Sequence, residues 1–525
     1  MADVVFHNGP IYTFDAAQPR AEALLMRDER IVAVGTAGAV RAAAHGGYDA
    51  IDLRGRALLP GLTDAHIHLL WVGVNRLNVM LDGVTARDEA LQRIAAHAAT
   101  LAPDAWVRGH GWDHSLWGNA WPTAAELDRV TGGRPALLSR KDAHSVWVNS
   151  RALALAGIDA TTTAPDGGAI LHDDTGAPLG ILQETAMALA RRVVPDYSWA
   201  EKRRALRDII AACNAVGLTS LHLPEGPDCF ALLQDLYAAN ELNARTLNYV
   251  RHHHLDEAIA LGLRSGLGDD WIKIGGVKMF SDGALGSQTC YMLHPFAGTD
   301  NVGLPIHSVE RLNADVLKAA TNGLSVMIHA IGDRANRMVL DAIAQPAVQA
   351  ARCALPHRLE HAQHLNPADV RRIAQLGVIA SMQPIHATAD REITERLLGA
   401  ERAAWSYAWQ PLLASGARLA FGSDAPVETF DPWAGLHAAV TRQRPGDATA
   451  SWHPELALSV QDALDAYILG PTHTSCELPI KGSLTSGKVA DLVVLNADPF
   501  AVDANDLANI KPDYTFVGGR AVWEG

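Results

Sequence analysis

The sequence predicts an α/β protein built around a (β/α)8 barrel with insertions, together with a small β-sandwich domain. Between residues 58 and 474, apolar runs typical of strands alternate with amphipathic segments typical of helices. About eight such strand–helix units in succession favour a parallel sheet that closes into a barrel, with an open doubly wound sheet as the alternative. Residues 103–180 are rich in Trp, Gly and turn residues, so we expect an insertion near the mouth of the barrel.

The small domain is expected to combine both ends of the chain, residues 1–57 and 475–525. Each end consists of short strand-like runs, with hairpin turns predicted at Asn8-Gly9 and Asp28-Glu29. Neither end alone holds enough strands for a stable sheet. Because chain termini often lie close together, one domain that pairs the two ends resolves this.

The composition is that of a globular protein, and it restricts the partners. Of 525 residues, 48% are hydrophobic and 19% are charged, and the formal net charge is -14. An acidic chain argues against nucleic acid as a partner, because phosphate contacts require a basic face. No apolar run approaches the roughly 20 residues that span a bilayer, and the N-terminus does not resemble a signal peptide. We therefore expect a cytoplasmic protein that acts on a small molecule, without a nucleic-acid or membrane partner.

The stretch "LLPGLTDAHIHLL", residues 58–70, ends an apolar strand candidate with two histidines. In a strand, residues two apart share a face, so His66 and His68 are expected to point the same way. Two imidazoles on one face suit a metal ion better than they suit a hydrophobic core.

Polar residues of the same kind end four further strand candidates. They are Lys278 in "GGVKMF", His329 in "SVMIHAIG", His361 in "RLEHAQ" and Asp424 in "LAFGSDAP". Each alone has a structural explanation: a hydrogen-bonded histidine, a helix-capping aspartate, or a lysine that extends to solvent. Catalytic groups of a (β/α)8 barrel lie at the C-terminal ends of its strands. The ordered set His-x-His, Lys, His, His and Asp therefore predicts one metal site.

This order of motifs resembles the amidohydrolase superfamily of metal-dependent hydrolases. More narrowly, it resembles the YtcJ-like branch (amidohydrolase family 3), which includes N-substituted formamide deformylase. Other stretches carry the resemblance along the chain, among them "GWDHSLWG", "GILQETA", "SDGALGSQT", "IGDRAN", "DPWAGLHAAVTR" and "GSLTSGKVADLVVLNADP". One departure is visible in "GLTSLHLPEG", where Leu223 replaces an acid that is usual in the branch.

The resemblance implies a metal-dependent amidohydrolase, a hydrolase acting on carbon–nitrogen bonds other than peptide bonds. The implied cofactor is a pair of zinc ions, with manganese or iron as alternatives, and a homodimer is common among relatives. CO2 would carboxylate Lys278, which would then bridge the two metals. Asp424 would act as general base and then general acid. The implied ligands are His66, His68 and Asp424 for one ion, and His329 and His361 for the other.

Alternative functions remain open on the sequence alone. A mononuclear deaminase usually has an acid shortly after the histidine of the fifth strand, and Asp333 matches that position poorly. An ester or carbamate hydrolase on the same scaffold is also compatible with the motifs. A non-catalytic scaffold protein is the third alternative, but such relatives usually lose ligands, and here all six positions are filled.

Three further residues are predicted to contact the substrate. Trp112 in "GWDHSLWG" suits an aromatic pocket, although tryptophan also packs in cores. His144 in "KDAHSVW" and Glu184 in "GILQETA" are polar candidates, and Glu184 has helix capping as its alternative role.

Overall fold

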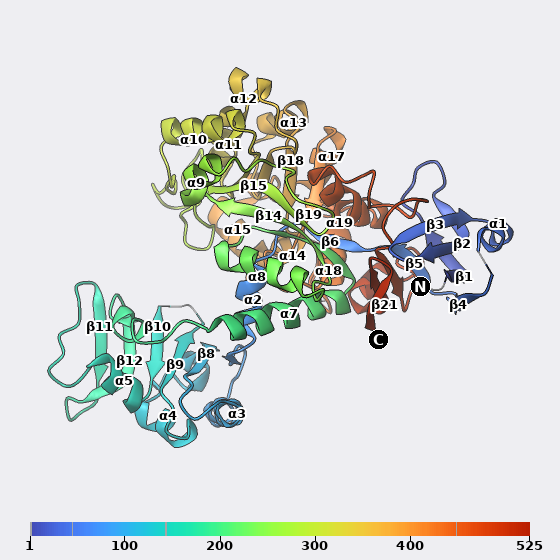
Figure 1. The fold of residues 1–525 in the computed structure, drawn as a ribbon. Helices are drawn as coiled ribbons and strands as arrows, with labels where there is room; N and C mark the ends of the chain where they lie inside the picture. Colours follow the sequence, from blue (N-terminus) through green and yellow to red (C-terminus); the bar gives the residue numbers. More distant parts are fainter. Residues whose placement is uncertain (1–2, 45, 142–143, 448) are drawn as a thin grey trace. The chain divides into compact units, whose positions relative to one another are not determined.

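A computed structural model describes residues 3–44, 46–141, 144–447 and 449–525. Its contacts divide the chain into two compact units, residues 1–70 with 206–525, and residues 71–205. The predicted α/β class is confirmed, because the first unit contains a nearly closed barrel of eight parallel strands (Figure 1). Within the described residues, no helix is both long enough and apolar enough to span a membrane.

The barrel strands follow one another in chain order around the sheet. They are β6 (Leu62–Asp64), β13 (Leu218–Leu223), β14 (Arg245–Arg251), β15 (Ile272–Phe280), β16 (Val326–Ala330), β17 (Arg358–His361), β18 (Ile379–Met382) and β19 (Arg418–Phe421). Neighbouring strands are parallel, with Arg251 opposite Lys278 and Ala330 opposite His361. This register aligns the carboxyl ends of the strands, where the predicted ligands lie.

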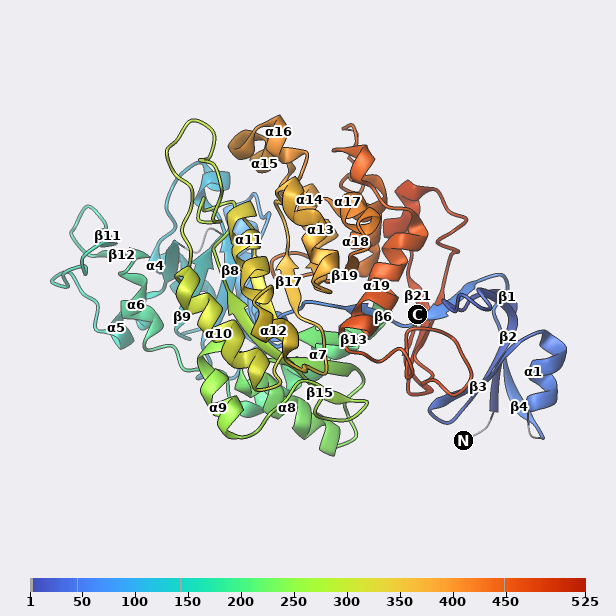
Figure 2. The same ribbon diagram turned by 90° about the horizontal axis from the view of Figure 1, so that it is seen from above.

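Helices lie around these strands (Figures 1 and 2). The main ones are α8 (Pro227–Ala238), α9 (Leu255–Ala260), α10 (Val309–Thr321), α11 (Asp333–Ile343), α13 (Pro367–Gln375), α17 (Trp409–Ala414), α18 (Pro432–Thr441) and α19 (Val460–Thr474). Shorter helices are α12 (Pro346–Ala350), α14 (Pro384–Ala389), α15 (Arg391–Leu398) and α16 (Ala400–Ala403). In α10 the Ser308 side chain caps the first turn, while Leu312 and Val316 form part of a buried face.

Loop contacts join the first and last strands of the barrel. The backbone N–H of Asp424 donates to the carbonyl of His66, and that of His68 donates to the carbonyl of Ala425. Strand β6 ends at Asp64, so both histidines lie in the connection that leads to α2 (Leu69–Asn75). The expectation that strand alternation aligns the two rings is therefore wrong, because bonds to the loop after β19 hold this segment instead.

Both ends of the chain contribute to one eight-stranded sheet in the first unit. Its strands are β1 (Asp3–Tyr12), β2 (Arg20–Arg27), β3 (Arg30–Gly35), β4 (Tyr48–Asp52), β5 (Ala57–Pro60), β20 (Leu492–Leu495), β21 (Pro512–Val517) and β22 (Arg520–Glu524). Strand β5 connects the two halves, since it pairs with both β1 and β20. Helix α1 (Ala37–Ala43) packs against β2 and β3.

Only one of the two predicted hairpin turns forms. Asp28, at φ 51°, turns the chain between β2 and β3. At Asn8-Gly9 the prediction is wrong, because β1 continues through both residues with an irregular register. Asn8 takes a φ of 62°, which asparagine tolerates well. The Asn-Gly pair therefore produces an irregularity within the strand instead of a turn.

The second unit, residues 71–205, has its own sheet and core. Its strands are β7 (Val79–Met80), β8 (Val107–Trp112), β9 (Ala136–Arg140), β10 (Ser145–Val148), β11 (Gly168–His172) and β12 (Pro178–Glu184). Its helices are α3 (Arg87–Thr100), α4 (Ala124–Val130), α5 (Ser150–Ala156) and α6 (Met187–Arg191), and α7 (Trp199–Ala215) leads back into the first unit. Trp112, Trp117 and Trp147 pack together with ring centroids 6.1 to 6.4 Å apart.

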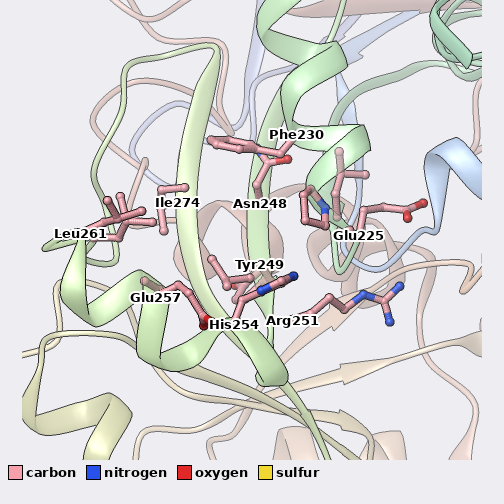
Figure 3. Close-up of a pocket in the computed structure, with 15 residues that line it drawn as sticks. Glu225, Phe230, Asn248, Tyr249, Arg251, His254, Glu257, Leu261 and Ile274 are labelled. Atoms are coloured by element: carbon pink, nitrogen blue, oxygen red, sulfur yellow. The ribbon is translucent and has the colours of Figure 1, made fainter. Parts of the chain in front are cut away.

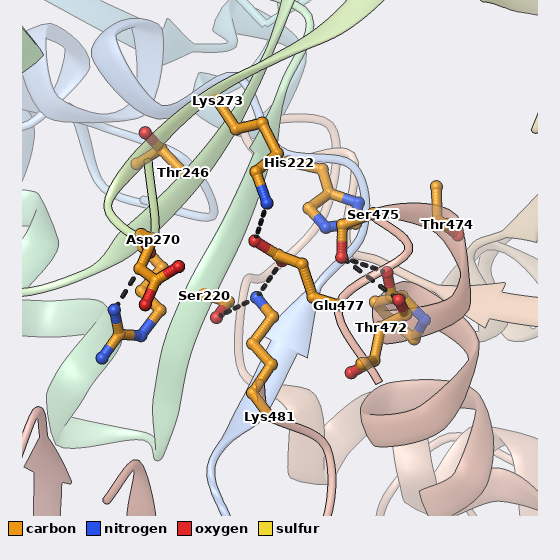
Figure 4. Close-up of polar contacts among 12 residues, drawn as sticks. Ser220, His222, Thr246, Asp270, Lys273, Thr472, Thr474, Ser475, Glu477 and Lys481 are labelled. Atoms are coloured by element: carbon orange, nitrogen blue, oxygen red, sulfur yellow. Dashed lines mark hydrogen bonds and ion pairs between the residues drawn. The ribbon is translucent and has the colours of Figure 1, made fainter. Parts of the chain in front are cut away.

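A group of charged side chains connects two barrel strands to the segment that precedes β20 (Figure 4). Lys273 at the start of β15 donates to Glu477 at 2.5 Å, and Lys481 lies 3.1 Å from the same carboxylate. Lys481 also donates to the Ser220 hydroxyl of β13 at 2.8 Å. Burial opposes ionisation of Glu477, but the two lysines lower the pKa of its carboxyl to about 2.

We predict that Glu477 makes stability pH-dependent in acid. Because its pKa falls from 4.5 to about 2 on folding, the unfolded state takes up the proton first. The stabilisation is therefore complete above pH 4.5 and is lost as the pH falls toward 2. Glu477→Gln should lower the free energy of unfolding at pH 7 by about 1–3 kcal/mol and flatten its pH dependence in that window. Urea titrations at several pH values measure both effects, with exposed Glu392→Gln as the control. An unaltered pH slope in Glu477→Gln would contradict the prediction.

Candidate active site

The predicted histidines and aspartate meet at the C-terminal end of the barrel. Nε2 of His66 and Nε2 of His68 lie 3.5 and 3.4 Å from Oδ1 of Asp424. The ring centroid of His361 lies 5.2 Å from that of His66 and 4.5 Å from that of His329. The structure therefore gathers five of the predicted ligands, although four separate segments of the chain supply them.

Lys278 is a buried lysine near the end of β15, with 1% of its surface exposed. Burial lowers the pKa of its ammonium group to about 8, and the charges of Glu360 and Asp424 oppose that shift. A lysine with this pKa is neutral in a larger fraction of molecules than an ordinary surface lysine. Its amine is therefore more available for chemistry at neutral pH.

Two of the ligands have a left-handed backbone. His361 has a φ of 71° and Asp424 a φ of 56°, a conformation that costs a residue other than glycine about 1–3 kcal/mol when the surroundings impose it. In a regular strand, neighbours such as Glu360 and His361 point to opposite faces. Here the Glu360 carboxylate contacts the His66 ring and His361 also lies beside that ring. The backbone strain therefore occurs where it directs side chains into the cluster.

Hydrogen bonds set the orientation of three of the rings. His66 Nδ1 donates to Glu360 Oε2 at 2.5 Å, His361 Nδ1 donates to Gln383 Oε1 at 2.8 Å, and His329 Nε2 donates to the Gly283 carbonyl at 3.0 Å. In each ring the bonded nitrogen carries the proton, so the opposite nitrogen has a lone pair for a metal ion.

The donor set fits a divalent metal ion on two grounds. Nε2 of His66 is buried and has no hydrogen-bond partner among the described residues, as expected for an atom that binds an ion. Burial also lowers the pKa values of His66 and His329 to about 4, so both rings are neutral at pH 7. Neutral imidazole and ionised carboxylate are ligands that zinc prefers. His66, His68 and Asp424 offer three such atoms within 4.8 Å of one another.

Asp424 remains ionised although it is almost fully buried. Burial opposes its charge, but His66, His68 and His361 around the carboxylate hold its pKa well below the usual range. A carboxylate that is ionised at neutral pH can bind a metal ion or accept a proton. Asp424 is thus suited to both of its predicted roles.

A buried ion pair supports His66 from inside the barrel. Arg358 and Glu360, both fully buried, form a salt bridge at 2.7 Å. Arg358 also donates to the Ala65 carbonyl at 2.6 Å and to Ser381 Oγ at 2.7 Å. This pair was not predicted, although "RLEH" contains a signal for it: two residues of opposite charge at positions that share one face of a strand.

Asp64 fixes the loop that carries the last ligand. Its carboxylate accepts hydrogen bonds from the His66 N–H and the Ser423 N–H, both at 3.0 Å, and from Ser423 Oγ at 2.6 Å. Burial raises the pKa of Asp64 to about 7. Through these bonds, the residues that precede Asp424 are tied to the segment that carries His66.

The predicted substrate contacts belong to the second unit. Trp112 is fully buried in its core, and its indole N–H donates to the Leu138 carbonyl. His144 Nδ1 lies 3.0 Å from Glu184, and both residues line a pocket of about 620 Å³ in that unit. The metal-ligand candidates all lie in the first unit.

An apolar pocket of about 280 Å³ lies between α8 and α9 of the first unit (Figure 3). Phe230, Leu261 and Ile274 line its apolar part, and its polar lining includes Arg251 and His254. None of the six predicted metal ligands lines it. This pocket is therefore separate from the candidate site.

A barrel that gathers histidines, a lysine and an aspartate at the C-terminal ends of its strands defines a metal-dependent hydrolase. The chain belongs to the Amidohydrolase family, whose sequence profile matches residues 49–523. The predicted resemblance to that superfamily and to its YtcJ-like branch is confirmed by relatives that match along the whole chain. Enzymes of this family act on small molecules.

Three curated relatives and one solved structure illustrate the similarity. The chain is 33% identical to the protein LONG AFTER FAR-RED 3 of Arabidopsis thaliana, over 100% of this chain and 92% of that protein. It is 32% identical to the putative amidohydrolase YtcJ of Bacillus subtilis (strain 168), over 99% of both. It is 29% identical to N-substituted formamide deformylase of Arthrobacter pascens, over 100% of this chain and 99% of that one. An uncharacterized metal-dependent hydrolase from Pyrococcus horikoshii OT3 matches with a TM-score of 0.80 at 27% identity, over 96% and 99% of the two chains.

We predict that Glu360→Gln weakens metal binding about 10–100-fold. The amide cannot replace the charged acceptor of the His66 N–H, and Arg358 loses its counter-ion in the barrel interior. The same change should lower the free energy of unfolding by about 3–5 kcal/mol, because it leaves one buried charge unpaired. Competition with a chromophoric chelator measures the metal affinity, and exposed Glu401→Gln serves as the control. Equal affinity in Glu360→Gln and the wild type would contradict this role.

Proposed function

We propose that the protein is a binuclear amidohydrolase that cleaves the C–N bond of an N-formyl or N-acyl amide with water. The observation that carries the proposal is the convergence of four histidines and Asp424, with buried Lys278 close enough for its pKa to respond to Asp424. Similarity along the full length to an N-substituted formamide deformylase supports a bond of this type.

In this proposal the ligands divide into two sets. His66, His68 and Asp424 would hold one ion, and His329 and His361 would hold the other. Zinc suits imidazole and carboxylate ligands best, with manganese or iron as alternatives. Both sets lie within one cluster, which two adjacent ions require.

Lys278 would serve both ions as a carbamate. Its neutral amine adds to CO2, so that an N–C bond forms and one proton leaves. The neutral amine thereby becomes an anion, and two oxygen ligands appear at the end of the side chain. A free ammonium group here would repel two dications, whereas a carbamate would attract them.

Metal ions held by these residues would supply Lewis-acid chemistry: they would lower the pKa of water and polarise the substrate carbonyl. Asp424 takes the proton of the attacking water on its carboxylate and delivers it to the leaving nitrogen. Glu360 and Gln383 keep His66 and His361 in the tautomers that leave a ring nitrogen available. Asp424 thus acts first as a general base and then as a general acid, while Glu360 and Gln383 hold the histidine rings in place.

A deaminase is disfavoured by the position of Asp333. Its carboxylate accepts a hydrogen bond from the backbone N–H of Leu293 at 2.7 Å, at the start of α11. It is therefore engaged in holding a loop, and no other acid follows His329 closely along the chain.

We predict that metal-loaded protein hydrolyses N-formyl amines or N-acyl amino acids within a panel that also contains cyclic amides, carbamates and esters. Lys278→Ala should lower kcat/KM at least about 1,000-fold, a loss of about 4 kcal/mol in transition-state stabilisation. Exposed Lys318→Ala is the matched control. Turnover of esters alone would contradict the amide assignment. Full activity in Lys278→Ala would exclude the bridging lysine and favour a mononuclear enzyme.

A further inference from the structure

His386 is a buried histidine beside the ligand cluster that the strand-end motifs do not include. It lies in α14, directly after β18, and 8% of its surface is exposed. Its Nε2 atom is buried and has no hydrogen-bond partner among the described residues. Leaving a buried polar atom without a partner destabilises the folded protein, so the position of Nε2 indicates a ligand that the ring is placed to bind.

The surroundings of His386 have the composition of a metal site. His361, His386 and Asp424 offer ligand atoms that all lie within 4.8 Å of one another, and all three residues are buried. The rings of His361 and His386 are inclined by only 12°, with centroids 6.5 Å apart. Two imidazoles and a carboxylate form a ligand set for zinc, with bonds of about 2.0–2.2 Å. Small movements of the side chains would bring all three atoms to that distance.

Helix α14 positions this residue through a short, well-defined turn. Pro384 occupies its first turn, and Gln383 precedes it as the residue that accepts the hydrogen bond from His361. His386 lies three residues after Gln383, in the first turn of the helix. The backbone N–H of His386 donates to the Gln383 carbonyl at 3.1 Å. The same turn thus orients one ring of the cluster and contributes another.

We infer that His386 binds a metal ion through Nε2, in a position that it shares with His361 and Asp424. The helix after the seventh strand then contributes a ligand. The other ligands come from the three strands that carry Lys278, His329 and His361 and from the loops that carry His66, His68 and Asp424. The inference rests on the proposed metal-dependent function. It adds His386 to the second cation position beside His361, and it places Asp424 within reach of both ions.

The test measures metal affinity in the full-length protein. Apoprotein prepared with a chelator is titrated with Zn²⁺ against a chromophoric competitor, and with Co²⁺ followed by visible absorption. His386→Ala and the bulkier His386→Gln are compared with the wild type and with His437→Gln, a buried histidine of α18 whose ring bonds Thr441. Thermal unfolding of the apoproteins identifies a variant that fails to fold, in which case the other variant decides.

Both His386 variants should bind the weakest-held ion at least tenfold less tightly and change the Co²⁺ spectrum, while His437→Gln should match the wild type. Unchanged affinity and spectrum in folded His386 variants would overturn the inference. If those variants lost only kcat/KM, His386 would contact the substrate instead.

The stoichiometry of the wild type separates this inference from the proposed function. A wild type that binds a single ion would contradict the two-metal proposal, and His386 would then be judged on the affinity of that ion. A wild type that binds no ion would overturn both.

Discussion

The contact between His66 and Glu360 is the interaction on which the site depends. It joins a fully buried histidine to a fully buried carboxylate, 2.5 Å apart. The carboxylate is tolerated there because Arg358 neutralises it and finds further acceptors in the barrel interior. This arrangement fixes one nitrogen of His66 as a donor and leaves the other for a metal ion. A charged pair in the barrel core therefore determines how a ligand is presented at the barrel end.

The closure of the barrel completes the site, because the segments that follow the first and last strands carry ligands that must meet. Asp64 bonds the loop after β19, and the Asp424 N–H bonds the His66 carbonyl. Asp424 follows the last barrel strand and the two histidines follow the first, and these contacts bring them together. Left-handed backbone at His361 and Asp424 then turns their side chains toward the cluster. Stability and ligand geometry are thus coupled at the same contacts.

The strand–helix alternation and the order of the strand-end residues were sufficient to predict the barrel and to name histidines and an aspartate that the structure brings together. They were not sufficient to explain the direction of the His66 and His68 side chains, which comes from loop bonds after a strand of three residues. Arg358 and Glu360 were not predicted because their role depends on the contact of Glu360 with His66, which lies far away in the sequence. His386 escaped because it lies beyond the strand end, on a helix. By sequence, Trp112 could either bind a ligand or pack in a core, and in the structure it is fully buried.

Anomalous scattering from crystals of the metal-loaded protein, measured at the absorption edge of the bound metal, tests the account most directly. A binuclear site predicts two peaks of anomalous density within one cluster, one beside His66, His68 and Asp424 and the other beside His361. Density for a carbamate should extend from Lys278 between them. Crystals of active protein with no peak at these residues, or with one peak and an unmodified Lys278, would contradict the binuclear site.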